Sequence, residues 1–271
     1  MPPLNEMKVT SRDNSLLRRA RAVRDGRDDD SIYIEGLRLC EEALASKLEI
    51  ETVIYSEELA RKKRAALLLE KMGKPSTKMA AVSEKLLASI SFTKTPQGIV
   101  VLAKHRANDK KNFTAKQPAA PFLIIMHSIS NPVNVGAILR TSEAAGVTGV
   151  ITTMNTSNPF SPKALRGAMG SAFRLPIWMG ASYEETTGWC DKRGIRTICA
   201  DAQGSKSYTE VDWGAPRALV VGPESTGFSA SEIALANEAV RIPMRGSVES
   251  LNVAVAAGIL LYEAARQQGR N

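Results

Sequence analysis

The chain has 271 residues, 44% of them hydrophobic, so it is long enough for one large or two ordinary domains, each with a real core. Its formal charge is +8, and no segment reaches the roughly 18 consecutive apolar residues of a membrane-spanning helix. Three scattered cysteines (Cys40, Cys190, Cys199) and two histidines (His105, His127) form neither a disulfide framework nor a zinc-binding cluster. We therefore expect a cytoplasmic protein without a protein-bound metal and without a membrane partner.

Helical and strand patterns alternate in the first part of the chain. We predict helices at residues 16–24, 36–46 and 57–72, and strands at residues 31–34, 52–55 and 98–103. This alternation indicates a small α/β domain covering residues 1–103, which carries 18 Lys and Arg against 15 Asp and Glu. The basic segments 18–21 and 61–64 are candidate phosphate contacts, although a solvated helix face is the commoner meaning of such clusters.

Residues 104–120 separate this domain from the rest of the chain. They carry five Lys and Arg against one acidic residue, lack apolar periodicity and contain Pro118 near their end. We predict a basic interdomain linker. A basic front half joined to a basic linker suits a phosphate-rich partner, although charge alone does not decide this.

The third part, residues 121–271, has a clearer alternation of strands and helices. We predict strands at residues 122–127, 149–153, 175–179, 196–200, 218–222 and 240–242, and helices at residues 135–145, 163–172, 183–193, 229–237 and 250–267. Such spacing predicts a parallel sheet covered by helices on both faces. The last helix is apolar almost all round, which places it in a core or a subunit interface.

Common nucleotide and hydrolase motifs are missing from this third part. The segment 128–136, which follows the first strand, has neither GxGxxG nor GxxxxGK[ST], and no Gly-x-Ser-x-Gly motif occurs. His127 is the only histidine that could serve a hydrolase triad here. An ordinary dinucleotide-binding fold, a P-loop fold and a serine hydrolase therefore fit poorly.

Three polar clusters stand where ligands usually bind in α/β sheets, beyond the ends of strands. The first is Asn131-Pro-Val-Asn-Val-Gly-Ala-Ile-Leu-Arg-Thr141, in which Asn134 is expected to cap a helix that carries Arg140. The second is Val220-Val-Gly-Pro-Glu-Ser-Thr-Gly-Phe228. In it, Gly222 would let a ligand approach and Glu224 could bind a hydroxyl group or a cation.

The third cluster is Ile242-Pro-Met-Arg-Gly-Ser-Val-Glu-Ser-Leu-Asn-Val-Ala-Val-Ala256. Gly246 permits unusual backbone geometry, and Ser250 is expected to cap the last helix, so that exposed amides could receive a ligand. Taken singly, each cluster has an ordinary explanation as a cap, a turn, an exposed helix charge or a strand-to-helix connection.

Together, in this order, the three clusters resemble the motifs of the SPOUT superfamily, specifically the SpoU or TrmH family of RNA ribose 2′-O-methyltransferases. The resemblance extends from residue 122 to about residue 267, and no motif residue departs from it. The front half is similar to the family's substrate-binding domain at residues 18–27, 34–43 and 96–101. That domain resembles a ribosomal-protein-type RNA-binding fold.

The resemblance implies a fold that composition does not indicate. It implies a catalytic domain with a parallel sheet and a deep trefoil knot, an arrangement that is otherwise rare in proteins. S-adenosylmethionine would lie in the knot, its adenine held by main-chain groups near Gly222, Ile242, Met244 and Leu251. The family also implies a homodimer in which the partner subunit completes each site.

The resemblance also implies roles for individual side chains. Arg140 would be the catalytic arginine, offered across the dimer, and we expect it to hold an RNA phosphate and stabilise the developing alkoxide because a guanidinium stays protonated. Asn134 would position Arg140 or the ribose, and Glu224 would orient the substrate or organise its loop. Ser250 and Asn252 would form hydrogen bonds near the reacting centre, and no metal is required.

The expected substrate is structured RNA with an accessible target nucleotide. We expect ribosomal (23S) RNA, because a separate front domain suits structured RNA better than a catalytic domain alone would. Transfer RNA is the close alternative. A protein that keeps the fold and binds RNA without catalysis is the alternative of a different class.

Overall fold

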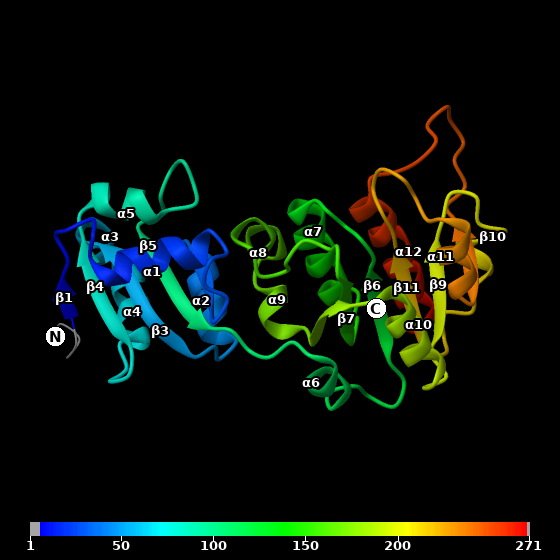
Figure 1. Cartoon of the computed structure of the whole chain (residues 1–271), viewed down its shortest axis with the longest axis horizontal. Coiled ribbons are helices and arrows are strands. Elements are labelled where there is room, and N and C mark those ends of the chain that lie inside the picture. Colours follow the sequence, from blue (N-terminus) through cyan, green and yellow to red (C-terminus); the bar gives the residue numbers. More distant parts are fainter. Residues whose placement is uncertain (1–5, 270–271) are drawn as a thin grey trace. The chain divides into compact units, whose positions relative to one another are not determined.

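The computed structural model describes residues 6–269, which form two compact units (Figure 1). The first unit contains the chain up to Arg106 together with Phe160–Phe173. The second contains Ala107–Pro159 and the chain from Arg174 onward. None of the helices formed by the described residues has the length and apolar character that a membrane span requires.

The first unit is built on a five-stranded mixed sheet with the strand order β1-β4-β3-β5-β2. Its strands are β1 (Glu6–Lys8), β2 (Ser31–Glu35), β3 (Ile50–Ser56), β4 (Lys78–Val82) and β5 (Ile99–Lys104). The helices around it are α1 (Ser15–Arg24), α2 (Leu37–Ala45), α3 (Glu57–Ala60), α4 (Lys63–Met72) and α5 (Glu84–Ile90), with α8 (Pro162–Ala168) and α9 (Ser171–Arg174) following later in the chain. β5 is antiparallel to β2 and β3, whereas β1, β3 and β4 are parallel. The expected small α/β domain is therefore present.

Two helices that we predicted as continuous are broken in this unit. The helix expected at residues 57–72 is divided into α3 and α4 at Arg61 and Lys62, so that Leu59 and Leu68 are both buried. The helix expected at residues 163–172 ends where Met169 and Gly170 adopt positive φ angles of 49° and 94°. A left-handed backbone ends a helix, and Gly170 is the residue type that favours it, whereas the apolar pattern of residues 57–72 does not indicate the break at Arg61 and Lys62.

The second unit contains a seven-stranded sheet with the order β10-β12-β9-β11-β6-β7-β8, in which every paired strand is parallel. Its strands are β6 (Phe122–Met126), β7 (Gly149–Thr153), β8 (Ile177–Ala181), β9 (Arg196–Ala200), β10 (Lys206–Ser207), β11 (Arg217–Val221) and β12 (Glu238–Arg241). All five residues of β6, β7 and β11 are buried, as expected for central strands. The parallel sheet is confirmed.

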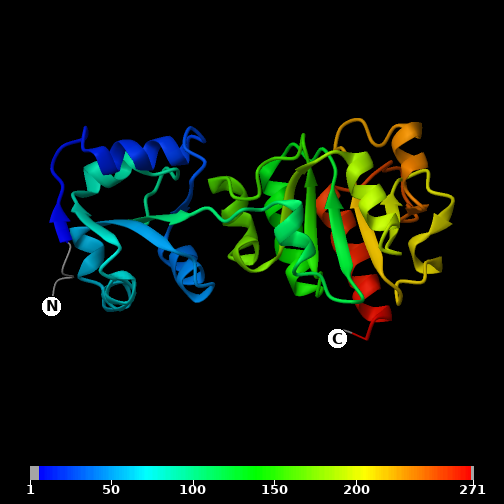
Figure 2. The same ribbon diagram turned by 60° about the horizontal axis from the view of Figure 1, so that its bottom comes forward.

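Helices cover both faces of this sheet (Figure 2). They are α6 (Lys110–Thr114), α7 (Pro132–Ala144), α10 (Tyr183–Asp191), α11 (Ala230–Leu235) and α12 (Val253–Gln267). Leu123 and Ile125 of β6 share a core with Phe113 of α6 and Trp189 of α10. Side chains alternate along a strand, so the other face of the sheet is left for α7 and α12, which pack against each other.

The segment 104–120, predicted to be a linker, is structured in part. β5 extends to Lys104, and residues 110–114 form α6, which Asp109 caps through a hydrogen bond from Asn112 N (2.8 Å). Phe113 is buried and packs on Trp178 and Trp189, with ring centroids 6.1 and 5.5 Å away. One buried aromatic residue in a polar segment gives no apolar periodicity, so the sequence pattern could not reveal this helix.

Both helix caps expected at the polar clusters were assigned to the wrong residue. Asn131, and not Asn134, caps α7 by accepting a hydrogen bond from Val133 N (3.0 Å). Asn252, and not Ser250, caps α12 by accepting from Ala254 N (2.9 Å) and Val255 N (3.4 Å). Asn is as good an N-cap as Ser, so residue type alone could not choose between them.

Candidate active site

The three polar clusters follow β6, β11 and β12, so they lie at the same edge of the parallel sheet of the second unit. The carboxyl ends of parallel strands form the usual ligand-binding edge. The third cluster, between β12 and α12, is a long loop that extends away from the sheet (Figure 1). The candidate site is therefore built from loops held by rigid, buried strands.

A chain of hydrogen bonds joins all three clusters through Glu224. One carboxylate oxygen, Oε2, accepts from Ser130 Oγ and from Asn131 N, both at 3.1 Å. The other, Oε1, accepts from Asn134 Nδ2. Asn134 Oδ1 in turn accepts from Asn252 Nδ2 at 3.3 Å. Three of the five predicted catalytic residues (Asn134, Glu224 and Asn252) are thus brought together.

The network has two structural consequences. Glu224 lies at the N-terminus of α7, where the positive end of the helix dipole and the Asn131 N–H that donates to it favour a carboxylate. Asn252 uses Oδ1 to cap α12 and Nδ2 to bond Asn134, so its orientation is fixed on both sides. The network orders the loop after β11 and the first turns of α7 and α12, while Glu224 and Asn252 stay exposed to a ligand.

Arg140 and Ser250, the other two predicted catalytic residues, lie outside the network. Arg140 is on α7, six residues after Asn134, which is about 1.7 turns and places it on another side of the helix. Its side chain is exposed and makes no hydrogen bond or ion pair within residues 6–269. Ser250 is exposed in the loop before α12. Within the described chain, neither Arg140 nor Ser250 is therefore hydrogen-bonded to Asn134, Glu224 or Asn252.

The residues predicted to hold the cofactor surround the same edge. Ile242, Met244 and Leu251 are half-buried on the loop between β12 and α12, and Gly222 is buried at the end of β11. We expected Gly222 to let a ligand approach, but the Phe228 side chain occupies this space: a Cβ atom at Gly222 would lie 2.2 Å from the Phe228 ring. The glycine is required because Phe228 occupies the space above it.

We expect Gly222→Ala to displace Phe228 and with it the loop after β11. The added methyl overlaps an aromatic ring, and overpacking of this kind costs about 1–3 kcal/mol. S-adenosylmethionine affinity, measured by isothermal titration calorimetry, should fall about tenfold or more, equivalent to about 1.4 kcal/mol. The double variant Gly222→Ala/Phe228→Leu removes the ring and should recover part of the affinity; unchanged affinity in the single variant would contradict this role for Gly222.

His127 forms a second link between the loops, which the sequence did not reveal. It is only 8% exposed and follows β6. Its Nδ1 lies 3.1 Å from Thr153 Oγ1, and its Nε2 lies 2.8 Å from Glu232 Oε1. Its ring also stacks on Tyr183 and Phe228, with centroids 4.5 and 5.9 Å away. His127 thus ties the end of β6 to Phe228 and to α11.

The Glu232 carboxylate is stabilised in its charged form. It accepts hydrogen bonds from Ser229 N (2.7 Å), from His127 and from Ser229 Oγ (2.7 Å), and these lower its pKa to about 2. Because the pKa of Glu232 is lower in the folded protein than in the unfolded chain, its ionised carboxylate stabilises the folded state. This stabilisation is present above about pH 4.5 and is lost as the pH falls towards 2.

We therefore expect Glu232→Gln to destabilise the protein most at neutral pH. Its free energy of unfolding, measured by urea denaturation, should approach that of the wild type as the pH is lowered from about 4.5 towards 2. Glu249→Gln, which changes an exposed carboxylate in the loop before α12, serves as the control and should show no such convergence. A difference between Glu232→Gln and wild type that does not depend on pH would contradict the assignment.

The predicted phosphate contacts of the first unit are only partly available. Arg19 donates to Asp28 (3.3 Å) and Glu51 (3.1 Å), and Arg64 pairs with Glu41. Arg18 and Arg61 are exposed and make no ion pair within the described part of the chain. No group of three metal-binding side chains occurs among residues 6–269.

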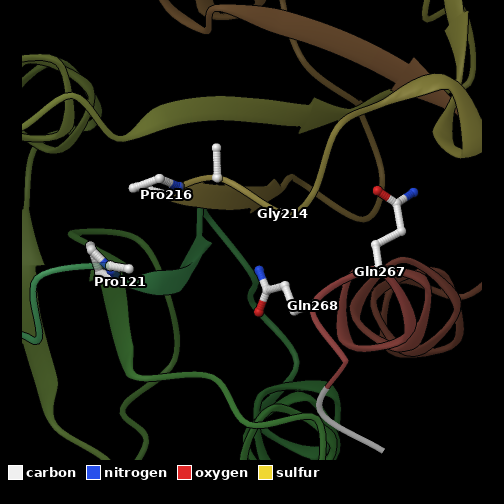
Figure 3. Close-up of a pocket in the computed structure, with 7 residues that line it drawn as sticks. Pro121, Gly214, Pro216, Gln267 and Gln268 are labelled. Atoms are coloured by element: carbon white, nitrogen blue, oxygen red, sulfur yellow. The ribbon is translucent and has the colours of Figure 1, made fainter.

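A cavity of about 250 Å³ lies elsewhere in the second unit (Figure 3). It is lined by Ala120, Pro121, Gly214, Ala215, Pro216, Gln267 and Gln268. Pro121 and Pro216 directly precede β6 and β11, so the cavity lies at the strand ends opposite to the three clusters. It is separate from the candidate active site.

Comparison with known proteins identifies the family to which the chain belongs. The SpoU rRNA Methylase family matches residues 121–262, and an MRM3-like substrate binding domain matches residues 17–101. The chain belongs to the SpoU rRNA methylase family. A SpoU relative, the 23S rRNA (guanosine-2′-O-)-methyltransferase RlmB of Bordetella pertussis, is 32% identical over 219 residues, 79% of this chain and 89% of that protein.

Two solved SpoU-type structures are similar over nearly the whole chain. The AdoMet-bound rRNA methyltransferase from Sinorhizobium meliloti has a TM-score of 0.84 and 29% identity, and the match covers 97% of this chain and 98% of that one. The SpoU methyltransferase AviRb from Streptomyces viridochromogenes, in complex with AdoMet, has a TM-score of 0.84 and 27% identity, covering 94% and 98%. The expected family, the α/β fold with a parallel sheet behind a smaller N-terminal domain, and the expected enzyme class are confirmed. The AdoMet bound in both structures agrees with the expected cofactor.

Proposed function

We propose that this protein transfers a methyl group from S-adenosylmethionine to a ribose 2′-oxygen of ribosomal RNA, most specifically 23S RNA. One observation carries the proposal: in a member of the SpoU family, Glu224 and Asn134 link all three motif loops into one hydrogen-bonded site. The substrate-binding domain matched at residues 17–101 and the name of the RlmB relative support ribosomal RNA.

The loop between β12 and α12 fits an adenine-bearing cofactor. No main-chain group of residues 242–251 makes a backbone–backbone hydrogen bond within the described part of the chain, so these N–H and C=O groups are available to a purine edge. Ile242, Met244 and Leu251 are half-buried there and would hold the cofactor beside Gly222. Bound S-adenosylmethionine supplies a methyl group on a sulfonium, a good leaving group that needs no metal.

Arg140 provides the charge that the reaction needs. As the 2′-oxygen bonds to the methyl carbon and its proton passes to water or a phosphate oxygen, negative charge develops on the ribose oxygen. A guanidinium stays protonated, so it can bind an RNA phosphate and at the same time stabilise the negative charge on the ribose oxygen. Asn134 and Glu224 hold the first turn of the helix that carries Arg140. In this proposal Asn252 and Ser250 would form hydrogen bonds with the ribose.

The protein acts as a homodimer in which Arg140 serves the partner's site. Arg140 is exposed and stands apart from the network of its own chain. Val133 on α7 and Val255 and Tyr262 on α12 leave apolar surface exposed beside it, which a second copy would cover. This part of the proposal places the last helix at a subunit interface.

The protein acts in the cytoplasm, and its catalytic domain contains a trefoil knot. The knot is supported by the path of the chain, which goes from β12 near the edge of the sheet to α12 against α7 and the central strand β11. We propose that residues 1–103 bind the RNA, that residues 104–120 connect the domains, and that residues 121–271 catalyse the transfer.

Maps of 2′-O-methylation in a strain with and without the gene test the substrate. We expect one position of 23S RNA to lose its methyl group, and we expect the wild-type gene, but not the Arg140→Ala gene, to restore it. Loss from a transfer RNA would favour the tRNA alternative. Unchanged maps of both RNAs would favour a non-catalytic RNA-binding protein.

A further inference from the structure

The connection between α5 and β5, residues 91–98, is hydrogen-bonded to the buried carboxylate of Glu35. Glu35, at the end of β2, is only 9% exposed. It accepts hydrogen bonds from Phe92 N (2.8 Å), Thr93 N (3.3 Å) and Thr93 Oγ1 (2.6 Å), and Tyr33 Oη lies 3.3 Å from its Oε2. A buried charge requires such partners, so breaking them would be costly, and they hold the backbone at Phe92 and Thr93 in place.

Both ends of this connection are fixed as well. Arg24 of α1 donates to Ser91 O (3.2 Å), and Tyr33 Oη donates to Ile90 O (2.8 Å). At the other end, Ser56 N donates to Gly98 O (2.9 Å). The connection is therefore an ordered element of the first unit, although it has no helix or strand (Figure 1).

The ordered backbone holds an aromatic ring towards solvent. Phe92 is 44% exposed, although a Phe of this size normally gains stability from burial. Lys94, two residues later, is exposed and forms no ion pair within the described residues. Thr93 and Thr95 stand beside it in the same segment. An exposed ring on a held backbone, with a cation two residues later, suits a ligand that has a flat face and a negative charge.

We propose that residues 91–98 bind an unpaired nucleotide of the RNA, with the base stacked on Phe92 and a nearby phosphate bound by Lys94. Proteins recognise single-stranded RNA in this way, by stacking bases on aromatic rings and pairing phosphates with cations. The cationic neighbour favours RNA over an apolar protein partner. The inference rests on the proposed RNA substrate and adds a place where the first unit reads an exposed base.

Binding of the full-length protein to unmodified 23S RNA transcript, measured across a range of salt concentrations, tests the proposal. Phe92→Ala should raise the dissociation constant about tenfold with an unchanged salt dependence, because stacking involves no counterion release. Lys94→Ala should reduce the slope of the logarithm of affinity against the logarithm of salt concentration by about one. Phe92→Tyr keeps the ring and should bind as the wild type does.

Two further variants separate stacking from simple apolar contact. Phe92→Leu remains apolar but lacks a ring, so it should bind as weakly as Phe92→Ala. Leu67→Ala, which removes a side chain of α4 that is 51% exposed, is the matched control and should have no effect. Wild-type affinity in Phe92→Ala or in Phe92→Leu would overturn the proposal.

Methyl transfer by the wild-type protein, assayed in parallel, keeps the two proposals apart. Weak RNA binding by Phe92→Ala without any methyl transfer by the wild type would contradict the proposed enzyme and leave the nucleotide site standing. Methyl transfer by the wild type with unchanged RNA affinity in Phe92→Ala would contradict the nucleotide site alone.

Discussion

Arg140→Ala is expected to lower the rate constant for methyl transfer about 100- to 1000-fold, the usual loss when a group that stabilises an oxyanion is removed. The side chain is exposed and makes no hydrogen bond or ion pair with residues 6–269, so the fold and the S-adenosylmethionine affinity should be preserved. Single-turnover transfer of labelled methyl to RNA measures the chemical step, and thermal unfolding checks the fold. Arg140→Lys keeps the charge but not the planar fork and should be intermediate.

A mixed dimer tests whether Arg140 acts across the subunit interface. In a dimer of one Arg140→Ala subunit and one Glu224→Ala subunit, one site would keep an intact arginine from one chain and an intact network from the other. Mixing the two inactive variants should therefore restore transfer. If the mixture stays as inactive as its components, Arg140 does not serve the partner's site.

Glu224→Ala is expected to lower methyl transfer about 100-fold by disordering all three motif loops together. The substitution removes the acceptor of Ser130 Oγ, Asn131 N and Asn134 Nδ2. Asn134 would then lose its link to the loop after β11, and a misplacement of about 1 Å can cost a factor of 100 in rate. Steady-state kinetics with both substrates should show a lower kcat and a higher KM for the cofactor.

Two variants control for the loss of charge. Glu224→Gln keeps one oxygen acceptor but presents an amide N–H₂ to donors that need an acceptor, so it should recover only part of the activity. Glu249→Ala removes an exposed carboxylate from the loop before α12 and should retain wild-type rates. Equal activity of Glu224→Ala and Glu249→Ala would show that the network does not matter to the reaction.

The second sheet could be predicted from the sequence because most of its strands are short apolar runs, and β6, β7 and β11 are buried along their whole length. The elements that the sequence missed lack that signal: β1 and β10 are edge strands of three and two residues, and α6 depends on the single buried Phe113. The patterns also missed β4 and α5, whose burial depends on packing in the first unit. A local sequence pattern shows which residues of a segment are suited to burial, but it does not show which other elements pack against them.

The meeting of Asn134, Glu224 and Asn252 followed from one rule, that loops after parallel strands share an edge of the sheet. The hydrogen bonds between these residues depend on how the strands are aligned with one another. No single motif of the sequence specifies that alignment. The pairing of His127 with Glu232 joins residues far apart in the chain, and the contact of Phe228 with Gly222 depends on how one loop folds back. Such contacts are determined by the tertiary structure, and the spacing of residues along the sequence does not indicate them.

The most direct test of the proposed function identifies the atom that receives the methyl group. Purified protein would be incubated with labelled S-adenosylmethionine and unmodified 23S RNA, and the RNA would then be hydrolysed in alkali, which cannot cleave after a 2′-O-methylated ribose. We expect the label in one alkali-resistant dinucleotide, and about 100-fold less initial labelling when Arg140→Ala replaces the wild type. Label on a base, or no label in any RNA, would contradict the assignment.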